Sequence, residues 1–189
     1  MTLVRKVAFL DRDGVLTIPT KVAGKGYAPR SVSELKFYDD AADSVARLKA
    51  AGFDVVIVTN QPDVSAGLIT LSNLSDIHEV VTKRLKVDKI RTCTHLAVDA
   101  CRCRKPLPGL LIDEDLEEPL SFTSSWMVGD RDSDIEAGRS VGCATIFIDR
   151  GWTGETGEKA DFTATDLTRA LDTIVGAVTR PTAGRPDDS

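Results

Sequence analysis

The sequence predicts an α/β fold, a doubly wound (Rossmann-like) parallel sheet flanked by helices. Three short apolar runs, at 7–10, 55–58 and 125–128, are typical of strands buried on both faces of a parallel sheet. Amphipathic segments with helical periodicity lie between these runs, which is the alternation of βαβ units. Each run is also followed by polar residues, and ligands bind at the carboxyl ends of the strands in such sheets.

The remaining elements follow from periodicity and from residues typical of helix ends. The expected strands, in chain order, are 4–10, 55–58, a segment within 90–98, 125–128 and 144–148. The expected helices are 39–51, 71–87, 108–116, 134–141 and 166–178. Gly52 is the expected stop of the first helix, Ser72 or Asn73 the cap of the second, and Pro108 lies in the first turn of the third. Residues 17–38 show little periodicity and predict a long loop or short excursion, which in compact domains is often functional.

Length and composition are those of a globular protein with one core. The 189 residues suit one domain, which we assign to 1–179, and the tail at 180–189 has the Pro, Gly and Asp content of a disordered segment. The net charge of −5 argues against a nucleic-acid partner. Neither a membrane-spanning run nor a signal peptide is visible, so we expect a cytoplasmic protein without a membrane partner, in which four cysteines do not form a disulfide framework.

Polar side chains follow three of the expected strands. They are Asp11 and Asp13 after the first strand, Thr59 and Asn60 after the second, and Asp130 and Asp134 after the fourth. Right-handed crossovers would bring these strand ends together on one edge of the sheet. Lys105, just before the third helix, adds a cation to this set. Carboxylates for Mg²⁺, a hydroxyl, an amide and a lysine suit phosphoryl transfer, in which an aspartate can be the nucleophile.

Each of these motifs has a structural explanation when it is taken alone. Asp-x-Asp is usually a solvated turn, and Thr59-Asn60 could cap the next helix. Gly129-Asp130 could be an ordinary turn, and a single Lys105 would by default be a surface charge. Their joint occurrence at strand ends and at a helix start favours a phosphoryl-transfer site over coincidence.

A second cluster of chemically active side chains lies in a loop at 93–103. Its members supply three thiolates and one imidazole, and they are Cys93, His95, Cys101 and Cys103. This ligand set satisfies tetrahedral Zn²⁺ with no open position, so the site would be structural and would fix the loop that carries Lys105. The alternative is a group of buried or redox-active cysteines beside an ordinary histidine.

Two further reactive residues stand outside both clusters. Cys143 precedes the apolar strand at 144–148, and we expect it in the core. His78 lies on a helix among charged neighbours, and we expect it in solvent.

The order of the strand-end motifs resembles that of the haloacid dehalogenase superfamily of phosphatases. Asp-x-Asp-Gly-x-Leu, a strand-ending Thr, a Lys and Gly-Asp-x-x-x-Asp occur in the expected order within residues 4–150. The resemblance implies that Asp11 is the nucleophile and that Asp13 is first the general acid and then the general base. It also implies that Thr59 and Lys105 hold the transferring phosphoryl group.

The same resemblance implies a magnesium site. Mg²⁺ would be bound by Asp11, by Asp130 and by the backbone carbonyl of Asp13. Asp134 would support the site.

The motif Cys-x-His…Cys-x-Cys-Arg-Lys-Pro resembles the zinc-loop subfamily that acts on D-glycero-D-manno-heptose 1,7-bisphosphate or histidinol phosphate. Members are small, essentially capless and usually monomeric, so the resemblance implies a monomer that hydrolyses a small phosphorylated metabolite. The heptose bisphosphate is the favoured substrate, and histidinol phosphate or another sugar phosphate is the alternative. The implied substrate-binding residues are Thr17, Thr20, Asn60, Gln61, Arg104 and Arg131.

Two departures from the subfamily pattern bear on substrate choice. Ala66 stands where an arginine is usual, which removes an anion contact from that position. The zinc loop has five residues between His95 and Cys101, a length closer to the histidinol-phosphate type. The sequence leaves the substrate and the preferred anomer open.

Overall fold

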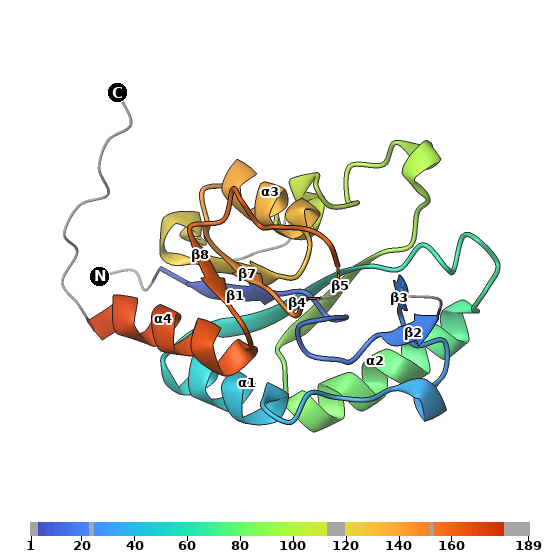
Figure 1. Cartoon of the computed structure of the whole chain (residues 1–189), viewed down its shortest axis with the longest axis horizontal. Coiled ribbons are helices and arrows are strands. Elements are labelled where there is room, and N and C mark those ends of the chain that lie inside the picture. Colours follow the sequence, from blue (N-terminus) through green and yellow to red (C-terminus); the bar gives the residue numbers. More distant parts are fainter. Residues whose placement is uncertain (1–3, 23–24, 113–119, 152, 180–189) are drawn as a thin grey trace.

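The computed structural model describes residues 4–22, 25–112, 120–151 and 153–179. Six strands form one sheet, and in chain order they are β1 (Val7–Leu10), β4 (Asp54–Asn60), β5 (Lys89–Cys93), β6 (Trp126–Gly129), β7 (Ala144–Ile148) and β8 (Phe162–Ala164). Their spatial order is β5-β4-β1-β6-β7-β8, and all the pairings are parallel. The chain leaves the central β1 toward one edge and later returns to build the other, which is the doubly wound arrangement. The predicted fold class is confirmed (Figure 1).

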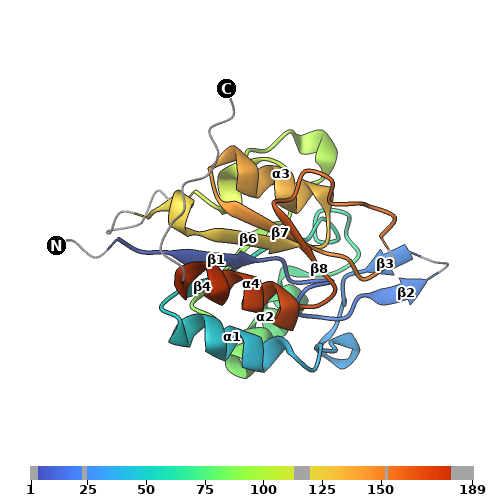
Figure 2. The same ribbon diagram turned by 60° about the vertical axis from the view of Figure 1, so that its left-hand side comes forward.

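Helices cover both faces of this sheet. One face carries α1 (Ala41–Ala50), α2 (Leu71–Leu85) and α4 (Leu167–Thr179), and the other carries α3 (Asp132–Ser140) (Figures 1 and 2). Helix α1 packs between α2 and α4, whereas α3 packs on β6 and β7. In the part of the chain that the structure describes, no helix has the length and apolar character needed to span a membrane.

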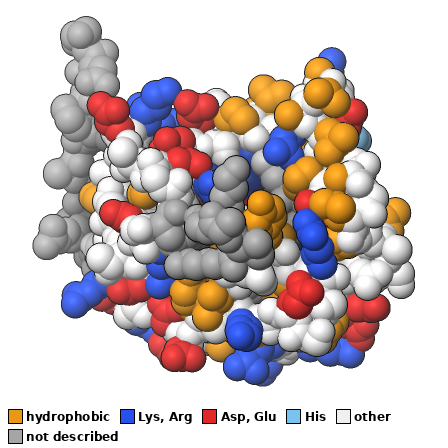
Figure 3. Space-filling model, turned by 45° about the vertical axis from the view of Figure 1, so that its right-hand side comes forward, with side chains coloured by type: hydrophobic (Ala, Val, Ile, Leu, Met, Phe, Trp, Pro, Cys, Tyr) orange, Lys and Arg blue, Asp and Glu red, His pale blue; other side chains and the backbone are white. Residues whose placement is uncertain are grey.

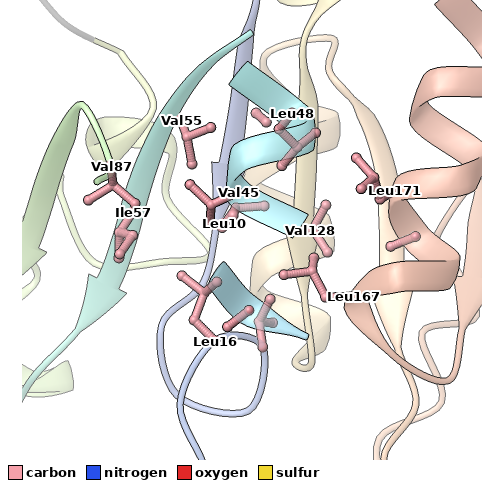
Figure 4. Close-up of a cluster of buried hydrophobic side chains, with 14 of the residues drawn as sticks. Leu10, Leu16, Val45, Leu48, Val55, Ile57, Val87, Val128, Leu167 and Leu171 are labelled. Carbon is pink, nitrogen blue, oxygen red and sulfur yellow. The ribbon is translucent and has the colours of Figure 1, made fainter. Parts of the chain in front are cut away.

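Strand β1 is apolar throughout because both of its faces are buried. Ala8 and Leu10 belong to the larger apolar cluster, which α1, α2 and α4 cover (Figure 4). Val7 and Phe9 point to the opposite face and belong to the second cluster, on the side of α3. Successive side chains of a strand alternate between faces, so a strand at the centre of a two-faced sheet needs an unbroken apolar run. Asp11, the residue that directly follows this strand, is therefore buried.

The third expected helix is wrong: only a short 3₁₀ turn, Pro108–Leu110, forms within 108–112, and 113–119 lies outside the described residues. A helix that continued would need the carbonyls of Leu110 and Leu111 as acceptors for later amides. Arg91 Nη1 donates to both of these carbonyls, at 2.9 and 3.1 Å. Pro and Gly in the turn also disfavour helix propagation.

Several element bounds differ from those expected. The cap of α2 is Thr70, whose Oγ1 accepts from the Asn73 amide at 3.1 Å, so neither predicted cap residue is right. Helix α3 begins at Asp132 rather than 134, and β4 continues through Asn60. Strand β1 starts at Val7, three residues later than expected. The edge strand β8 was not predicted, because three residues carry too little periodic pattern.

The region at 17–38 contains a small hairpin and a 3₁₀ turn rather than a plain loop. The hairpin pairs β2 (Thr20–Val22) with β3 (Lys25–Tyr27) in antiparallel register, and the turn is Val32–Glu34. Figures 1 and 2 place this hairpin beyond the carboxyl ends of β1 and β4. On the face shown in Figure 3, basic and acidic side chains are interspersed, and no large field of one charge covers it. The expected tail at 180–189 lies outside the described residues.

Candidate active site

A pocket of about 470 Å³ lies at the carboxyl ends of β1, β4 and β6. The hairpin residues Gly26 and Tyr27 form part of its wall. Most of the side chains singled out from the sequence line it, namely Asp11, Asp13, Thr59, Asn60, Gln61, Arg104, Lys105, Arg131 and Asp134. Segments far apart in the chain therefore meet where the strand ends converge, as the parallel topology requires.

Lys105 is the centre of the hydrogen-bond network in this pocket. It is only 4% exposed, and its ammonium group donates to Asp11 Oδ1 and to the Val58 carbonyl, both at 2.6 Å. It also pairs with Asp134 Oδ1 at 2.6 Å. An ammonium has three donors, and each has an acceptor here. The lysine thus joins motifs from three strand ends into one charged cluster.

Asn60 fixes the segment that carries this lysine. Its side-chain amide donates to the Lys105 carbonyl and its side-chain oxygen accepts from the Lys105 amide, both at 3.1 Å. Asn60 was predicted to bind substrate. The structure instead gives both of its polar atoms to the main chain of Lys105, although the residue still borders the pocket.

Asp130 is a buried carboxylate whose charge is only partly compensated, by the more distant Arg131 and Lys105. It is completely buried, and among the described residues neither of its oxygens has a hydrogen-bond partner. Burial, followed by the nearby charges of Asp11 and Asp134, raises the pKa of Asp130 to about 9. A buried unpaired carboxylate is costly, so this site calls for a cation. One oxygen from each of Asp11, Asp130 and Asp134 lies within 4.8 Å of the others, close enough to surround a single ion.

Two glycines make room for these carboxylates. Gly14 has φ +104°, and a Cβ there would stand 2.1 Å from Asp130 Oδ2. A Cβ on Gly129 would stand 2.2 Å from the Asp134 side chain. The main chain can therefore approach both carboxylates only where it has no side chain.

Asp11 and Asp134 differ in how well their charges are compensated. Burial raises the pKa of Asp11 to about 7, with Asp134 and Asp13 adding to the rise and Lys105 opposing it. Asp134 has a partner on each oxygen, since Oδ1 pairs with Lys105 and Oδ2 accepts from the Arg131 amide at 3.1 Å. Asp134 is thus placed to orient the lysine, whereas Asp11 and Asp130 have the unmet need for positive charge.

The Asp13 carboxylate faces a different set of partners. It accepts from Arg12 Nη2 and from Gln61 Nε2, both at 2.8 Å at Oδ2, and from Thr17 Oγ1 at 2.8 Å at Oδ1. Burial alone would raise the pKa of Asp13, but the Arg12 charge and these hydrogen bonds hold it below its usual value. Gln61 Nε2 also donates to Thr59 Oγ1 at 2.8 Å, which links the second strand end to Asp13.

Two of the predicted substrate-binding residues lie away from the main pocket. Thr17 is fully buried and spends its hydroxyl on Asp13 and the Arg12 carbonyl. Thr17 is not among the residues that line the main pocket, so its predicted contact with substrate has no support from this geometry. Thr20 is exposed on β2 and borders a separate hollow of about 400 Å³ with Tyr27 and Arg30.

The pocket rim carries two arginines, as predicted, and one glutamate that was not. Arg131 Nη1 pairs with Glu155 Oε1 at 3.1 Å, and Glu155 Oε2 accepts from the Asp132 amide. Arg104 Nη1 donates to the His95 carbonyl at 3.3 Å, which ties the rim to the cysteine loop. Glu155 lies in a loop with no periodic pattern, so nothing in the sequence marked it.

The four residues of the cysteine loop converge as predicted. Cys93 Sγ is 3.6 Å from both His95 Nδ1 and Cys101 Sγ, and Cys103 Sγ is 3.2 Å from His95 Nδ1 and 3.5 Å from Cys101 Sγ. These sulfurs are too far apart for disulfides, in which S–S is about 2.05 Å. Ligands bound to one tetrahedral zinc at about 2.3 Å would stand roughly 3.7 Å apart. The spacing therefore fits a shared metal ion.

Of the two residues outside the clusters, one was predicted correctly. Cys143 is 2% exposed and packs in the apolar cluster on the side of α3, as expected. His78 is half-buried and not in solvent, so that expectation is wrong. Its Nε2 lies 3.1 Å from Arg12 Nη1, and burial followed by the Arg12 charge lowers the pKa of His78 to about 4.

The fold and the pocket together define a class, the hydrolases that resemble haloacid dehalogenase (HAD). In this chain an aspartate at the end of the central strand faces a lysine, and a nearby buried carboxylate requires a cation. Residues 102–173 match the HAD-hydrolase-like family. The chain is 32% identical over 150 residues to the D-glycero-beta-D-manno-heptose-1,7-bisphosphate 7-phosphatase of Rhodopseudomonas palustris. This match covers 73% of this chain and 80% of that protein. The chain belongs to the family of HAD-like phosphatases, and it is therefore a hydrolase of phosphoric monoesters.

Two further proteins are similar to this chain. The protein of the same name from Pseudomonas aeruginosa is 32% identical over 152 residues, with 78% of this chain and 83% of that protein covered. The crystal structure of D,D-heptose 1,7-bisphosphate phosphatase from B. bronchiseptica, complexed with magnesium and phosphate, superposes with a TM-score of 0.76. It is 28% identical, and the match covers 91% of this chain and 99% of that one.

The raised pKa of Asp130 predicts how the stability of the metal-free protein depends on pH. Because the pKa of Asp130 is raised in the folded state, that state binds its proton more tightly than the unfolded chain does. The contribution of Asp130 to stability is therefore greatest at low pH and is lost as the pH rises toward about 9. We expect Asp130→Asn to stabilise the protein in EDTA at pH 8 by about 2 kcal/mol, or roughly 5 °C in Tm.

Thermal denaturation of both proteins at pH 6 and pH 8 checks this expectation. The gain in stability from Asp130→Asn should be larger at pH 8 than at pH 6. Groups such as His78 titrate in both proteins, so their contribution cancels in the difference between the two. A gain that is equal at the two pH values, or larger at pH 6, would contradict an incompletely compensated carboxylate at this position.

Proposed function

We propose that this chain removes the 7-phosphate of D-glycero-D-manno-heptose 1,7-bisphosphate in a Mg²⁺-dependent reaction. The observation that carries the proposal is the contact of Asp11 with the Lys105 ammonium in the pocket, close to the buried Asp130, whose oxygens have no hydrogen-bond partner among the described residues. The names of the relatives that cover most of the chain support the choice of substrate.

The magnesium ion would be held by Asp11, Asp130 and the backbone carbonyl of Asp13. When bound, it supplies positive charge to the phosphoryl oxygens. Such an ion fits the two oxygens of Asp130, which have no hydrogen-bond partner among the described residues, and the raised pKa values of Asp11 and Asp130. Asp134 supports the site through Lys105.

The side chains then divide a two-step phosphoryl transfer among them. A carboxylate oxygen of Asp11 attacks phosphorus, so that a P–O bond to Asp11 forms as the bond to the sugar oxygen breaks. Asp13 is ionised in the free protein, and the negative charge of the bound phosphate would raise its pKa so that it can take up the proton that it gives to the leaving alkoxide. It then takes a proton from the water that attacks the aspartyl-phosphate, which releases inorganic phosphate and restores Asp11. Thr59 and Lys105 hold the phosphoryl oxygens during both steps.

Charge on the pocket rim favours a bisphosphate over histidinol phosphate. Arg104 and Arg131 line the pocket in addition to Lys105, and a second phosphate on the substrate would contact the guanidinium of Arg104 and compete with Glu155 for that of Arg131. Histidinol phosphate carries an amine and an imidazole at its far end, where two arginines are unfavourable. The short zinc loop remains the one feature that favours histidinol phosphate.

A phosphate-release screen across sugar phosphates and histidinol phosphate tests the proposed substrate. We expect kcat/KM to be at least about tenfold higher for the heptose 1,7-bisphosphate, since a charged contact is worth about 1.5–3 kcal/mol. The beta anomer is the first to compare, and the remaining product should be the heptose 1-phosphate. A higher kcat/KM for histidinol phosphate would replace the proposed substrate with that one.

The nucleophile assignment predicts that Asp11→Asn loses hydrolysis of p-nitrophenyl phosphate by roughly 10⁴-fold or more, because an amide oxygen cannot form the aspartyl-phosphate. Release of p-nitrophenol measures it. Asp76→Asn, the same change at an exposed position of α2, is the control and should behave as wild type. Full activity in Asp11→Asn would mean that another group attacks phosphorus.

We further propose that the cysteine loop binds a structural Zn²⁺ ion and that the protein acts as a cytoplasmic monomer with one domain over 1–179. The four converging ligand atoms support a closed site with no position for substrate. This site would fix Arg104 and Lys105, which follow Cys103 directly in the chain.

Removal of a cysteine ligand should lower zinc content and stability together. A 100-fold loss of zinc affinity in Cys101→Ser would cost about 2.7 kcal/mol, or roughly 5–10 °C in Tm. Elemental analysis and thermal denaturation measure the two effects. Cys143→Ala is the matched control, because it loses packing in the core but should keep its zinc. A full complement of zinc in both Cys101→Ser and Cys103→Ser would rule out the metal site.

A further inference from the structure

Arg12, the residue between the two aspartates of the first motif, is completely buried. It has the largest fully buried side chain in the part of the chain that the structure describes. Its Nε lies 3.1 Å from each oxygen of Asp13, and its Nη2 lies 2.8 Å from Asp13 Oδ2. A guanidinium that grips a carboxylate with two nitrogens sets both the distance and the plane of that carboxylate. The orientation of Asp13 therefore depends on the orientation of Arg12.

The remaining edge of the Arg12 guanidinium contacts His78, from the middle of α2. Arg12 Nη1 and His78 Nε2 are 3.1 Å apart. Arginine can only donate hydrogen bonds, so Nε2 must be the acceptor and the imidazole must be neutral with its proton on Nδ1. The lowered pKa of His78 agrees with this state. This contact connects α2, on one face of the sheet, to the end of the first strand.

We propose that His78 is a positioning residue for Asp13 and acts through Arg12. This inference rests on the acid–base role proposed for Asp13. Without an acceptor at position 78, a buried Nη1 donor would lose its partner, and the guanidinium would turn or shift to find another. Asp13 would move with it, because two of the donors to its carboxylate belong to Arg12. Proton transfer depends steeply on such placement.

The effect of losing His78 should be partial. Asp13 also accepts from Thr17 Oγ1 and from Gln61 Nε2, both at 2.8 Å, and these two anchors do not involve α2. We therefore expect about a tenfold loss in the step that needs Asp13, well below the loss expected for removing Asp13 itself.

Three variants on α2 test the proposal. His78→Leu keeps the bulk but removes the acceptor, whereas His78→Gln keeps an acceptor oxygen near the place of Nε2. Ser75→Ala, at an exposed position one turn earlier, is the control for changes to this helix. Each is assayed with the best sugar phosphate from the substrate screen and with p-nitrophenyl phosphate. The alkoxide of a sugar needs a proton from Asp13 to leave, and nitrophenolate does not.

For His78→Leu we expect kcat/KM to fall about tenfold with the sugar phosphate and less than threefold with p-nitrophenyl phosphate. His78→Gln should recover most of the loss, and Ser75→Ala should match wild type. An equal fall with both substrates would mean that His78 only supports the fold. Wild-type values in His78→Leu, or a loss in His78→Gln as large as in His78→Leu, would also overturn the proposal.

A measurement on the unaltered chain keeps the proposal testable if His78→Leu does not fold. The chain has two histidines, so ¹⁵N-histidine labelling gives two sets of ring signals, and the His78→Gln spectrum identifies those of His78. We expect an unprotonated Nε2 at pH 7.5. A proton on Nε2 would exclude acceptance from Arg12 and overturn the inference. This result does not depend on turnover, so it is distinct from a failure of the proposed substrate.

Discussion

The contact between the Lys105 ammonium and its three acceptors is the interaction on which the site depends. Asp11 comes from the end of β1, the Val58 carbonyl from β4 and Asp134 from α3, so one side chain connects three separate segments. The lysine is buried, and its charge is stable there only because two carboxylates lie at 2.6 Å. Removing the lysine would leave the carboxylates of Asp11 and Asp134 buried without this counter-charge.

This cluster contains more negative charge than positive charge. Three buried carboxylates, on Asp11, Asp130 and Asp134, share one lysine in the same small space. The shortage of positive charge is concentrated at Asp130, where both oxygens are unpartnered among the described residues. A site that is strained in this way lowers the stability of the empty protein and raises its affinity for a cation and for phosphoryl oxygens. Stability and function are therefore opposed at the same atoms.

Asp13 stands apart from that shortage although it is only two residues from Asp11. Its carboxylate turns toward Arg12, Thr17 and Gln61, which supply four donors, about as many as a carboxylate can accept. Two neighbouring aspartates thus have opposite environments, one short of positive charge and one well supplied. In the protein without a bound cation, the pKa of Asp11 is therefore raised and that of Asp13 is lowered.

The sequence by itself determined the fold class and the residue types that gather at the strand ends. Apolar runs such as Val7–Leu10 need a two-faced sheet, and parallel strands bring residues like Asp11, Lys105 and Asp130 to one edge. Only the tertiary structure decided which partner each polar side chain takes. It turned Asn60 to the main chain of Lys105 and buried Arg12 against an imidazole from a distant helix. Periodicity predicts the face of an element, but hydrogen-bond partners depend on contacts between segments that are remote in the chain.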